Sequence, residues 1–208
     1  MDYFLNDREY SAAVAQHYDT LLAGGDDPVL DPPALQEYMN LWDGPRFLEL
    51  LGLKKTDSVL EIGVGTGRLA VKTVPLCGRF TGIDLAPNTL LRAQKHLKDY
   101  DHVELICDDF MMHTFSEQYD VVYSSLTWMH ISNKLKAARR VAEVLKPGGR
   151  FVLCIEREKR YEINAGTTRI AVFPDDQMCV GTELGGAGLK LKRFAETAYG
   201  LIYAAVKE

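Results

Sequence analysis

Residues 59–70, VLEIGVGTGRLA, constrain the fold more than any other stretch of this chain. A short run of apolar and branched residues ends at Gly63, and glycines then occupy positions 63, 65 and 67. The residues that follow, RLAVKTVPL, have a helical pattern. A strand, a glycine loop and a helix in this order are typical of an open parallel sheet, which binds ligands beyond the carboxyl ends of its strands. Glycine accepts positive φ and lets a ligand touch the main chain, so we expect a ligand at this loop.

The sequence alternates between strand and helix patterns from residue 58 onward. Short runs rich in Val, Ile, Leu and Phe predict strands at 58–63, 79–84, 102–107, 119–125 and 150–156. Between them, helical patterns occur at residues 68–76, 86–100 and 133–145. This alternation predicts a doubly wound α/β fold, a mostly parallel sheet with helices on both faces. Two further strand-like runs, 189–197 and 199–207, predict a terminal β-hairpin that adds an antiparallel strand.

At 208 residues the chain is most economically one domain, residues 1–208. We expect a helical cap over residues 1–57, because residues 7–24 and the segment after Pro32 have helical patterns. Residues 58–156 form the ligand-binding core. Residues 157–208 hold a substrate-side insertion and the terminal hairpin, and residues 157–187, rich in glycine, are expected to be mostly loop with short helices.

Composition excludes several classes of protein. The net charge is −5, which argues against a nucleic-acid partner, because such partners select basic surfaces. No apolar run has the ~18 residues that span a bilayer, and the first ten residues carry no basic segment of a secretory signal. The four cysteines are widely spaced, which predicts no structural metal, and Cys77, Cys107 and Cys154 are expected to be buried and reduced. A cytoplasmic protein without a membrane partner is expected. Oligomeric state cannot be inferred from the sequence.

Three details of the glycine segment distinguish between ligands. The loop is G-x-G-x-G, not G-x-G-x-x-G, and it lacks the Lys-Ser/Thr of a phosphate-binding P-loop. Glu61 precedes the first glycine, where a carboxylate repels a pyrophosphate and attracts an amino group. Asp84 ends the next strand, where an acid accepts hydrogen bonds from ribose hydroxyls. A ligand with a ribose and a cationic amine fits these details, and S-adenosyl-L-methionine is such a ligand. The alternative for the glycines is a purely structural turn. The alternative for Asp84 is a cap of the following helix.

Residues 57–155 as a whole resemble the class I S-adenosylmethionine-dependent methyltransferases, with "VLEIGVGTGRLA" similar to their first motif and "GIDLAPNTLLRAQKHL" to their second. The segments "HVELICDDFMMHTF", "YDVVYSSLTWMHI" and "LKPGGRFVL" resemble three later strand regions of that family. The resemblance implies a Rossmann-like, seven-stranded sheet whose last strand is antiparallel. It also implies cofactor contacts, which fall on Glu61, Gly63, Val64, Gly65, Gly67, Asp84, Leu85, Asp109, Phe110 and Ser124. Among these, Leu85 lies beside the adenine, Asp109 meets the adenine amino group, and the main chain of Ser124 meets the methionine part. Asp108 and Asp109 as a solvated loop pair are the alternative.

The acceptor side of the site carries fewer signals. Tyr10, His17 and Tyr18 lie at helical spacing in the N-terminal segment, and the resemblance places Tyr18 near the sulfonium. Trp128 and His130 follow the fourth strand, near the expected mouth of the site. Packing in the core is the alternative for each of these side chains, and for His130 it stands beside a role as general base.

The expected function is methyl transfer from S-adenosylmethionine to a nitrogen or oxygen atom of a small molecule, by in-line displacement. Alignment supplies most of the catalysis, and a base is needed only if the acceptor loses a proton, so no catalytic residue is assigned. The first 52 residues have two basic and ten acidic side chains, which could attract a cationic amine or only confer solubility. An NAD(P)-dependent oxidoreductase and a non-catalytic S-adenosylmethionine-binding protein are the alternatives.

Overall fold

The computed structural model describes residues 6–208. Residues 1–5 lie outside the described residues. They are half of the ten-residue N-terminal segment whose lack of a basic segment argues against a secretory signal. Among the described residues no helix is long and apolar enough to cross a membrane.

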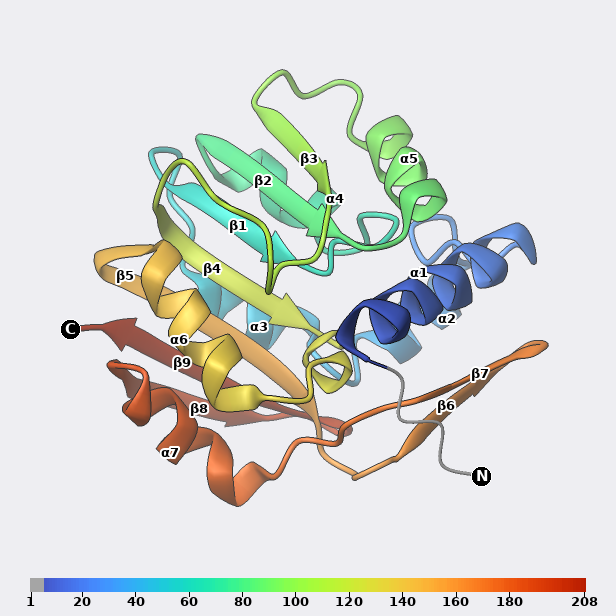
Figure 1. Cartoon of the computed structure of the whole chain (residues 1–208). Coiled ribbons are helices and arrows are strands. Elements are labelled where there is room, and N and C mark those ends of the chain that lie inside the picture. The colour runs from blue at the N-terminus through green and yellow to red at the C-terminus, as the bar shows by residue number, and fades with distance from the viewer. Residues whose placement is uncertain (1–5) are drawn as a thin grey trace.

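A seven-stranded sheet forms the centre of the molecule (Figure 1). Its strands lie in the order β3-β2-β1-β4-β5-β9-β8. The first five of these are parallel, and β9 runs antiparallel to both β5 and β8. The strands are β1 (Ser58–Ile62), β2 (Arg79–Asp84), β3 (Val103–Cys107), β4 (Tyr119–Ser125), β5 (Leu145–Glu156), β8 (Leu189–Glu196) and β9 (Gly200–Lys207). The predicted sheet and its terminal hairpin are confirmed. Strand order reverses between β1 and β4, which is where ligands bind in such sheets.

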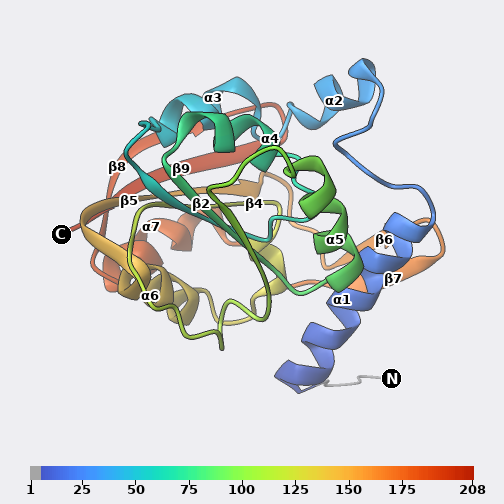
Figure 2. The same ribbon diagram turned by 90° about the horizontal axis from the view of Figure 1, so that it is seen from above.

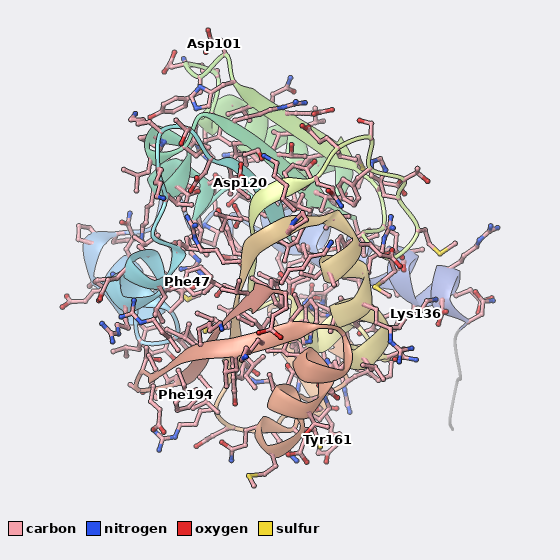
Figure 3. The ribbon with its side chains drawn as sticks, turned by 90° about the vertical axis from the view of Figure 1, so that its left-hand side faces the viewer. Phe47, Asp101, Asp120, Lys136, Tyr161 and Phe194 are labelled. Atoms are coloured by element: carbon pink, nitrogen blue, oxygen red, sulfur yellow. The ribbon has the colours of Figure 1, made fainter. Side chains whose placement is uncertain are left out.

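Helices cover both faces of this sheet. They are α1 (Asp7–Ala23), α2 (Pro33–Met39), α3 (Gly44–Leu51), α4 (Ala70–Thr73), α5 (Pro87–His96), α6 (Lys134–Val144) and α7 (Gln177–Gly186), with short 3₁₀ turns η1 (Val74–Leu76) and η2 (Trp128–His130). One hydrophobic cluster packs α3, α4 and α5 on the sheet, and a second packs α6 and α7 on the opposite face. Figure 3 views the sheet between these layers, with Phe47 of α3 on one side and Lys136 of α6 on the other.

Two expectations from the sequence are wrong. Residues 157–187 are not mostly loop, because β6 (Glu162–Ala165) and β7 (Thr168–Ala171) pair as an antiparallel hairpin before α7. The turn between them uses Gly166 at a positive φ of 56°. Cys107, at the end of edge strand β3, is exposed, whereas Cys77 and Cys154 are buried as expected; all of the cysteines are free thiols.

Helix α1 lies across the carboxyl ends of the central strands and beside α5 and the β6–β7 hairpin (Figures 1 and 2). It begins with a capping box, in which the side chain of Asn6 and the side chain of Glu9 each accept the other's backbone N–H. Asp19 then fastens it to the start of α5, because its carboxylate accepts from the backbone N–H of Thr89 at 2.9 Å and the side-chain amide of Asn88 at 2.8 Å. A third, small hydrophobic cluster lies beneath α1. The helix therefore covers the edge of the sheet at which a ligand is expected.

Candidate active site

The glycine loop after β1 holds its shape through contacts that need glycine. Gly63 has a φ of 76°, and a Cβ atom there would lie 2.1 Å from the hydroxyl oxygen of Thr127. Gly65 has a φ of 57° and faces open space, and its N–H donates to Asp84 Oδ2 at 2.8 Å. The second oxygen of Asp84 accepts from the N–H of Ala86 at 3.0 Å. Asp84 thus ties the loop to the end of β2 and keeps free lone pairs for a ligand.

Glu61 is buried, with an exposed fraction of 3%. Along β1 it points to the face covered by α3 and α4, where the hydroxyl of Tyr123 donates to its Oε2 at 2.7 Å. Burial raises the pKa of Glu61 to about 8, a shift that the Tyr123 hydrogen bond opposes. A carboxyl group in this state ionises when a cation approaches, so it suits an ammonium ligand.

A buried ion pair supports the glycine loop from the side of α3. Arg68, which follows the last glycine, makes two hydrogen bonds to the fully buried Asp43, one of them at 3.0 Å. Ser125 donates to the same carboxylate at 2.7 Å. Burial raises the pKa of Asp43, but the hydrogen bonds and charge of Arg68 outweigh burial and hold this pKa below its usual range. Arg68 makes its hydrogen bonds to Asp43, whereas the hydrogen bond that Glu61 accepts comes from the neutral hydroxyl of Tyr123.

A single cavity of about 1070 Å³ joins the glycine loop to α1, η2 and β7. Eleven of the fifteen residues expected at the site line it. They are Tyr10, Tyr18, Glu61, Gly63, Val64, Gly65, Asp84, Leu85, Asp109, Phe110 and His130. Residues from five separate parts of the chain therefore come together around one space.

Asp109 lies in the cavity wall after β3, where the sequence predicts the adenine contact. Its Oδ2 accepts from the hydroxyl of Ser11 on α1 at 2.8 Å, and its Oδ1 accepts from the N–H of Met111 at 2.8 Å. Asp108 instead points to His113, at 2.8 Å. The apolar side chains of Leu85 and Phe110 lie in the same wall. Both aspartates line the cavity, Asp108 with its side chain bound to His113 and Asp109 with its side chain bound to Ser11 and Met111.

Opposite this wall, His130 lies between two tyrosines of α1. Its Nε2 is 2.8 Å from the hydroxyl of Tyr18 and its Nδ1 is 3.2 Å from the hydroxyl of Tyr10. The Tyr10 hydroxyl also donates to the carbonyl of Ala171 in β7 at 2.8 Å. Burial lowers the pKa of His130 to about 4, helped by the charges of His17 and Lys134. The imidazole is therefore neutral at pH 7.

Four expected site residues do not line the cavity. Ser124 is fully buried and donates to the carbonyl of Ile62, because side chains alternate along β4 and its neighbour Ser125 faces the cavity. Trp128 packs against Phe151 in the core, at 5.4 Å between ring centroids.

His17 also points away from the cavity, and its Nδ1 lies 2.7 Å from the hydroxyl of Thr168 on β7. Its position on α1 is rotated by ~100° from that of Tyr18. Gly67 has a φ of 97° and packs toward α5, where a Cβ atom would lie 3.8 Å from Ala93. Ser124, Trp128, His17 and Gly67 are therefore not among the residues that line the cavity.

The sequence analysis missed other residues of the cavity wall. Ser11, Arg68, Ser125 and Thr127 line it, and Leu126 does so with a φ of 57°, which is rare outside glycine. The hydrogen-bond partners of Ser11, Arg68 and Ser125 lie far away in sequence, so no local pattern marks these residues. The left-handed Leu126 reverses the chain just after β4. No group of three or more His, Cys, Asp or Glu side chains suited to a metal occurs in residues 6–208.

Comparison with known proteins identifies similar methyltransferases. Residues 60–153 match a family described as a methyltransferase domain. Over 107 residues the chain is 30% identical to the demethylmenaquinone methyltransferase of Tropheryma whipplei, a match that covers 51% of this chain and 44% of that protein. The chain thus spans less than half the length of this curated relative.

Solved structures extend the similarity to nearly the whole chain. The N-methyltransferase NodS from Bradyrhizobium japonicum WM9, in complex with S-adenosyl-L-homocysteine, superposes with a TM-score of 0.70 at 21% identity, covering 94% of this chain and 98% of NodS. The magnesium protoporphyrin IX methyltransferase of Synechocystis PCC 6803, with bound S-adenosylmethionine, gives 0.74 at 15% identity and covers all of both chains.

The domain match over residues 60–153 and the shared fold support a class I S-adenosylmethionine-dependent methyltransferase. S-Adenosylmethionine is the cofactor of that class.

Proposed function

We propose that this protein transfers the methyl group of S-adenosylmethionine to a nitrogen or oxygen atom of a small molecule by in-line displacement. The observation that supports this most is the single cavity of about 1070 Å³, which runs from the glycine loop to His130. Ligand sites commonly occupy ~300–1,000 Å³, so there is room for a cofactor and an acceptor side by side.

The charges of the wall suit a cationic cofactor. Seven carboxylate side chains line the cavity against three basic ones. The acids are Asp7, Asp26, Asp31, Glu61, Asp84, Asp108 and Asp109, and the bases are Arg8, Arg68 and Lys136. S-Adenosylmethionine carries a sulfonium and an ammonium, and the hydrogen bond that Glu61 accepts comes from the neutral hydroxyl of Tyr123. The residues present therefore fit this group.

Each part of the cofactor then has a place in the wall. Glu61 binds the methionine ammonium, and the open backbone at Gly65 allows close approach to the loop. Asp84 receives the ribose hydroxyls, and Asp109 receives the adenine amino group. The main-chain contact with the methionine part stays at Ser124, and its neighbour Ser125 lines the cavity. When bound, the cofactor supplies a methyl group that is already activated, so the protein contributes mainly alignment.

Several observations bear on the acceptor. The relatives are named for demethylmenaquinone, for magnesium protoporphyrin IX and as an N-methyltransferase. These names favour a small molecule and leave the accepting atom open, since one fold serves many substrates. On the acceptor side the cavity is lined by residues of α1 and β7 and by the apolar Leu126 and Phe173. That lining suits a compact, partly apolar acceptor.

The test is turnover by the full-length protein. S-Adenosylmethionine is incubated with panels of small amines, phenols and carboxylates, and S-adenosylhomocysteine formation is followed. Formation that depends on the acceptor supports the proposal. Cofactor binding without turnover on any panel would instead indicate a non-catalytic binding protein, and NADH binding would indicate an oxidoreductase.

A further inference from the structure

His130 and the two tyrosines of α1 form a hydrogen-bonded chain in the wall of the cavity. Tyr18, His130 and Tyr10 follow one another at 2.8 Å and 3.2 Å, and Tyr10 ends on the carbonyl of Ala171 at 2.8 Å. The chain links α1, η2 and β7, which are distant in sequence. Tyr18 and Asp84 line the same cavity, and after burial the charge of Asp84 is the next cause that raises the pKa of Tyr18.

The hydrogen bonds fix where the protons lie. A phenol has one proton, and Tyr10 donates its proton to the carbonyl of Ala171, which can only accept. The oxygen of Tyr10 must then accept from Nδ1 of His130, which therefore carries the ring proton. A neutral imidazole has one ring proton, so Nε2 has a free lone pair and accepts the proton of Tyr18. The oxygen of Tyr18 keeps its lone pairs for a group in the cavity.

We infer that Tyr18 and His130 form a proton relay that removes the proton of the methyl acceptor, and that Tyr10 is a positioning residue that fixes the tautomer this relay needs. This inference rests on the proposed methyl transfer. It assigns to Tyr18 a catalytic contact with the acceptor in place of a contact with the cofactor alone.

The step balances without any further reactant. A lone pair of the acceptor atom forms the new bond to the methyl carbon, and the carbon–sulfur pair stays on sulfur, which becomes a neutral thioether. The proton of the acceptor passes to the Tyr18 oxygen, while the proton of Tyr18 passes to Nε2 of His130. Nδ1 keeps its proton on Tyr10. One positive charge disappears at sulfur as another forms on the imidazole, so the net charge of the cavity does not change. The imidazolium then releases its proton to water.

The surroundings of His130 favour a relay that begins neutral. Tyr10 and Tyr18 on α1 are the titratable side chains hydrogen-bonded to the ring, and the charges of His17 on the same helix and Lys134 at the start of α6 lower its pKa without a hydrogen bond to it. Lys134 is paired with Asp175 at 3.0 Å. The ring of Phe173 packs on Tyr10, at 5.1 Å between centroids, and holds this tyrosine against β7.

The first test needs no cofactor. In the full-length protein labelled with ¹⁵N-histidine, we expect a neutral His130 with its proton on Nδ1 at pH 7. In Tyr10→Phe the proton should shift to Nε2, because that variant has no acceptor for Nδ1–H. A wild-type His130 with its proton on Nε2 would overturn the inference.

The second test separates binding from turnover. In Tyr18→Phe and His130→Asn, turnover of an acceptor that must lose a proton should fall by ~10²–10⁴-fold. Affinity for S-adenosylhomocysteine, measured by calorimetry, should change by less than about threefold. Tyr10→Phe should lower kcat by about tenfold and leave KM nearly unchanged. Tyr161→Phe is the control, because Tyr161 is 71% exposed and lies outside the cavity lining.

The outcomes distinguish two failures. If wild-type protein produces no S-adenosylhomocysteine with any acceptor, the proposed function fails, and the relay fails with it. If wild-type protein turns over and both Tyr18→Phe and His130→Asn match it in kcat, the relay alone is wrong.

Discussion

The two walls of the cavity are built in opposite ways. The cofactor wall comes from the ends of β1, β2 and β4 and the loops that directly follow them, within residues 61–127. The acceptor wall joins α1, η2 and β7, and its central hydrogen bond links residues 112 positions apart. The cofactor wall rests on the sheet and two large hydrophobic clusters, whereas the acceptor wall rests on one small cluster around Val14 and Met129. The cofactor wall is thus built on the central sheet. The wall that meets the acceptor is assembled from the peripheral segments α1, η2 and β7.

The largest effect should come from breaking the ion pair behind the cofactor wall. Asp43→Ala leaves Arg68 without its buried partner and should lower the free energy of unfolding by about 3–5 kcal/mol. Chemical unfolding measures this. Glu196→Ala, which removes a half-exposed partner of Arg157, should cost less than ~1 kcal/mol. Equal losses in the two variants would show that the Asp43 pair carries no special weight.

Two glycines of the same loop should respond differently. Gly63→Ala places a Cβ atom against Thr127 at a positive φ and should cost about 2–4 kcal/mol. Gly65→Ala meets open space, so it should cost only the ~1–2 kcal/mol of the backbone conformation. The bulkier Gly65→Val should nonetheless weaken cofactor binding, because its side chain enters the cavity. A fully stable Gly63→Ala protein would contradict the described packing of the loop.

Glu61 should make stability depend on pH. Its pKa is about 8 in the folded protein and about 4.5 when unfolded, so the folded state holds an extra proton between these values. This contribution is complete below pH 4.5 and is lost as pH rises through 8. Glu61→Gln removes the loss, so relative to wild type its free energy of unfolding should rise by a few kcal/mol from pH 4.5 to 8.5. If the free energies of unfolding of Glu61→Gln and wild type differ by the same amount at pH 4.5 and pH 8.5, Glu61 is ionised in the folded protein.

The smallest effect belongs to the attachment of the acceptor wall. Asp19→Ala removes the hydrogen bonds that α1 makes to the start of α5 and should cost about 1–2 kcal/mol. Hydrogen exchange should become faster in α1 while protection in β1 and β4 is unchanged. Equal loss of protection in α1 and the sheet would mean that the two walls unfold as one unit.

The sequence predicted the cofactor wall much better than the acceptor wall. Glu61, Gly65 and Asp84 lie at strand ends, where a local pattern also fixes the position in space. The β6–β7 hairpin was missed although Ile163 and Ile170 flank a turn at Gly166, because short, mostly polar strands give a weak signal. Trp128 was placed at the mouth of the site, but the 3₁₀ turn that presents His130 to the cavity turns this ring into the core.

The contacts that close the acceptor wall could not be predicted from one sequence. Tyr10, Tyr18 and His130 were each candidates, but nothing local shows that they meet in one hydrogen-bonded chain. The same holds for Asp43 and Arg68, which lie 25 positions apart. Such pairs depend on how helices dock on the finished sheet.

Calorimetric titration with S-adenosylmethionine tests the central claim most directly, with NADH as the competing ligand and Asp84→Ala as the matched variant. We predict that the wild-type protein binds S-adenosylmethionine and not NADH, and that Asp84→Ala weakens this binding by ~1–3 kcal/mol while remaining folded. Binding of NADH, or an affinity for S-adenosylmethionine that Asp84→Ala leaves unchanged, would contradict the assignment of this cavity.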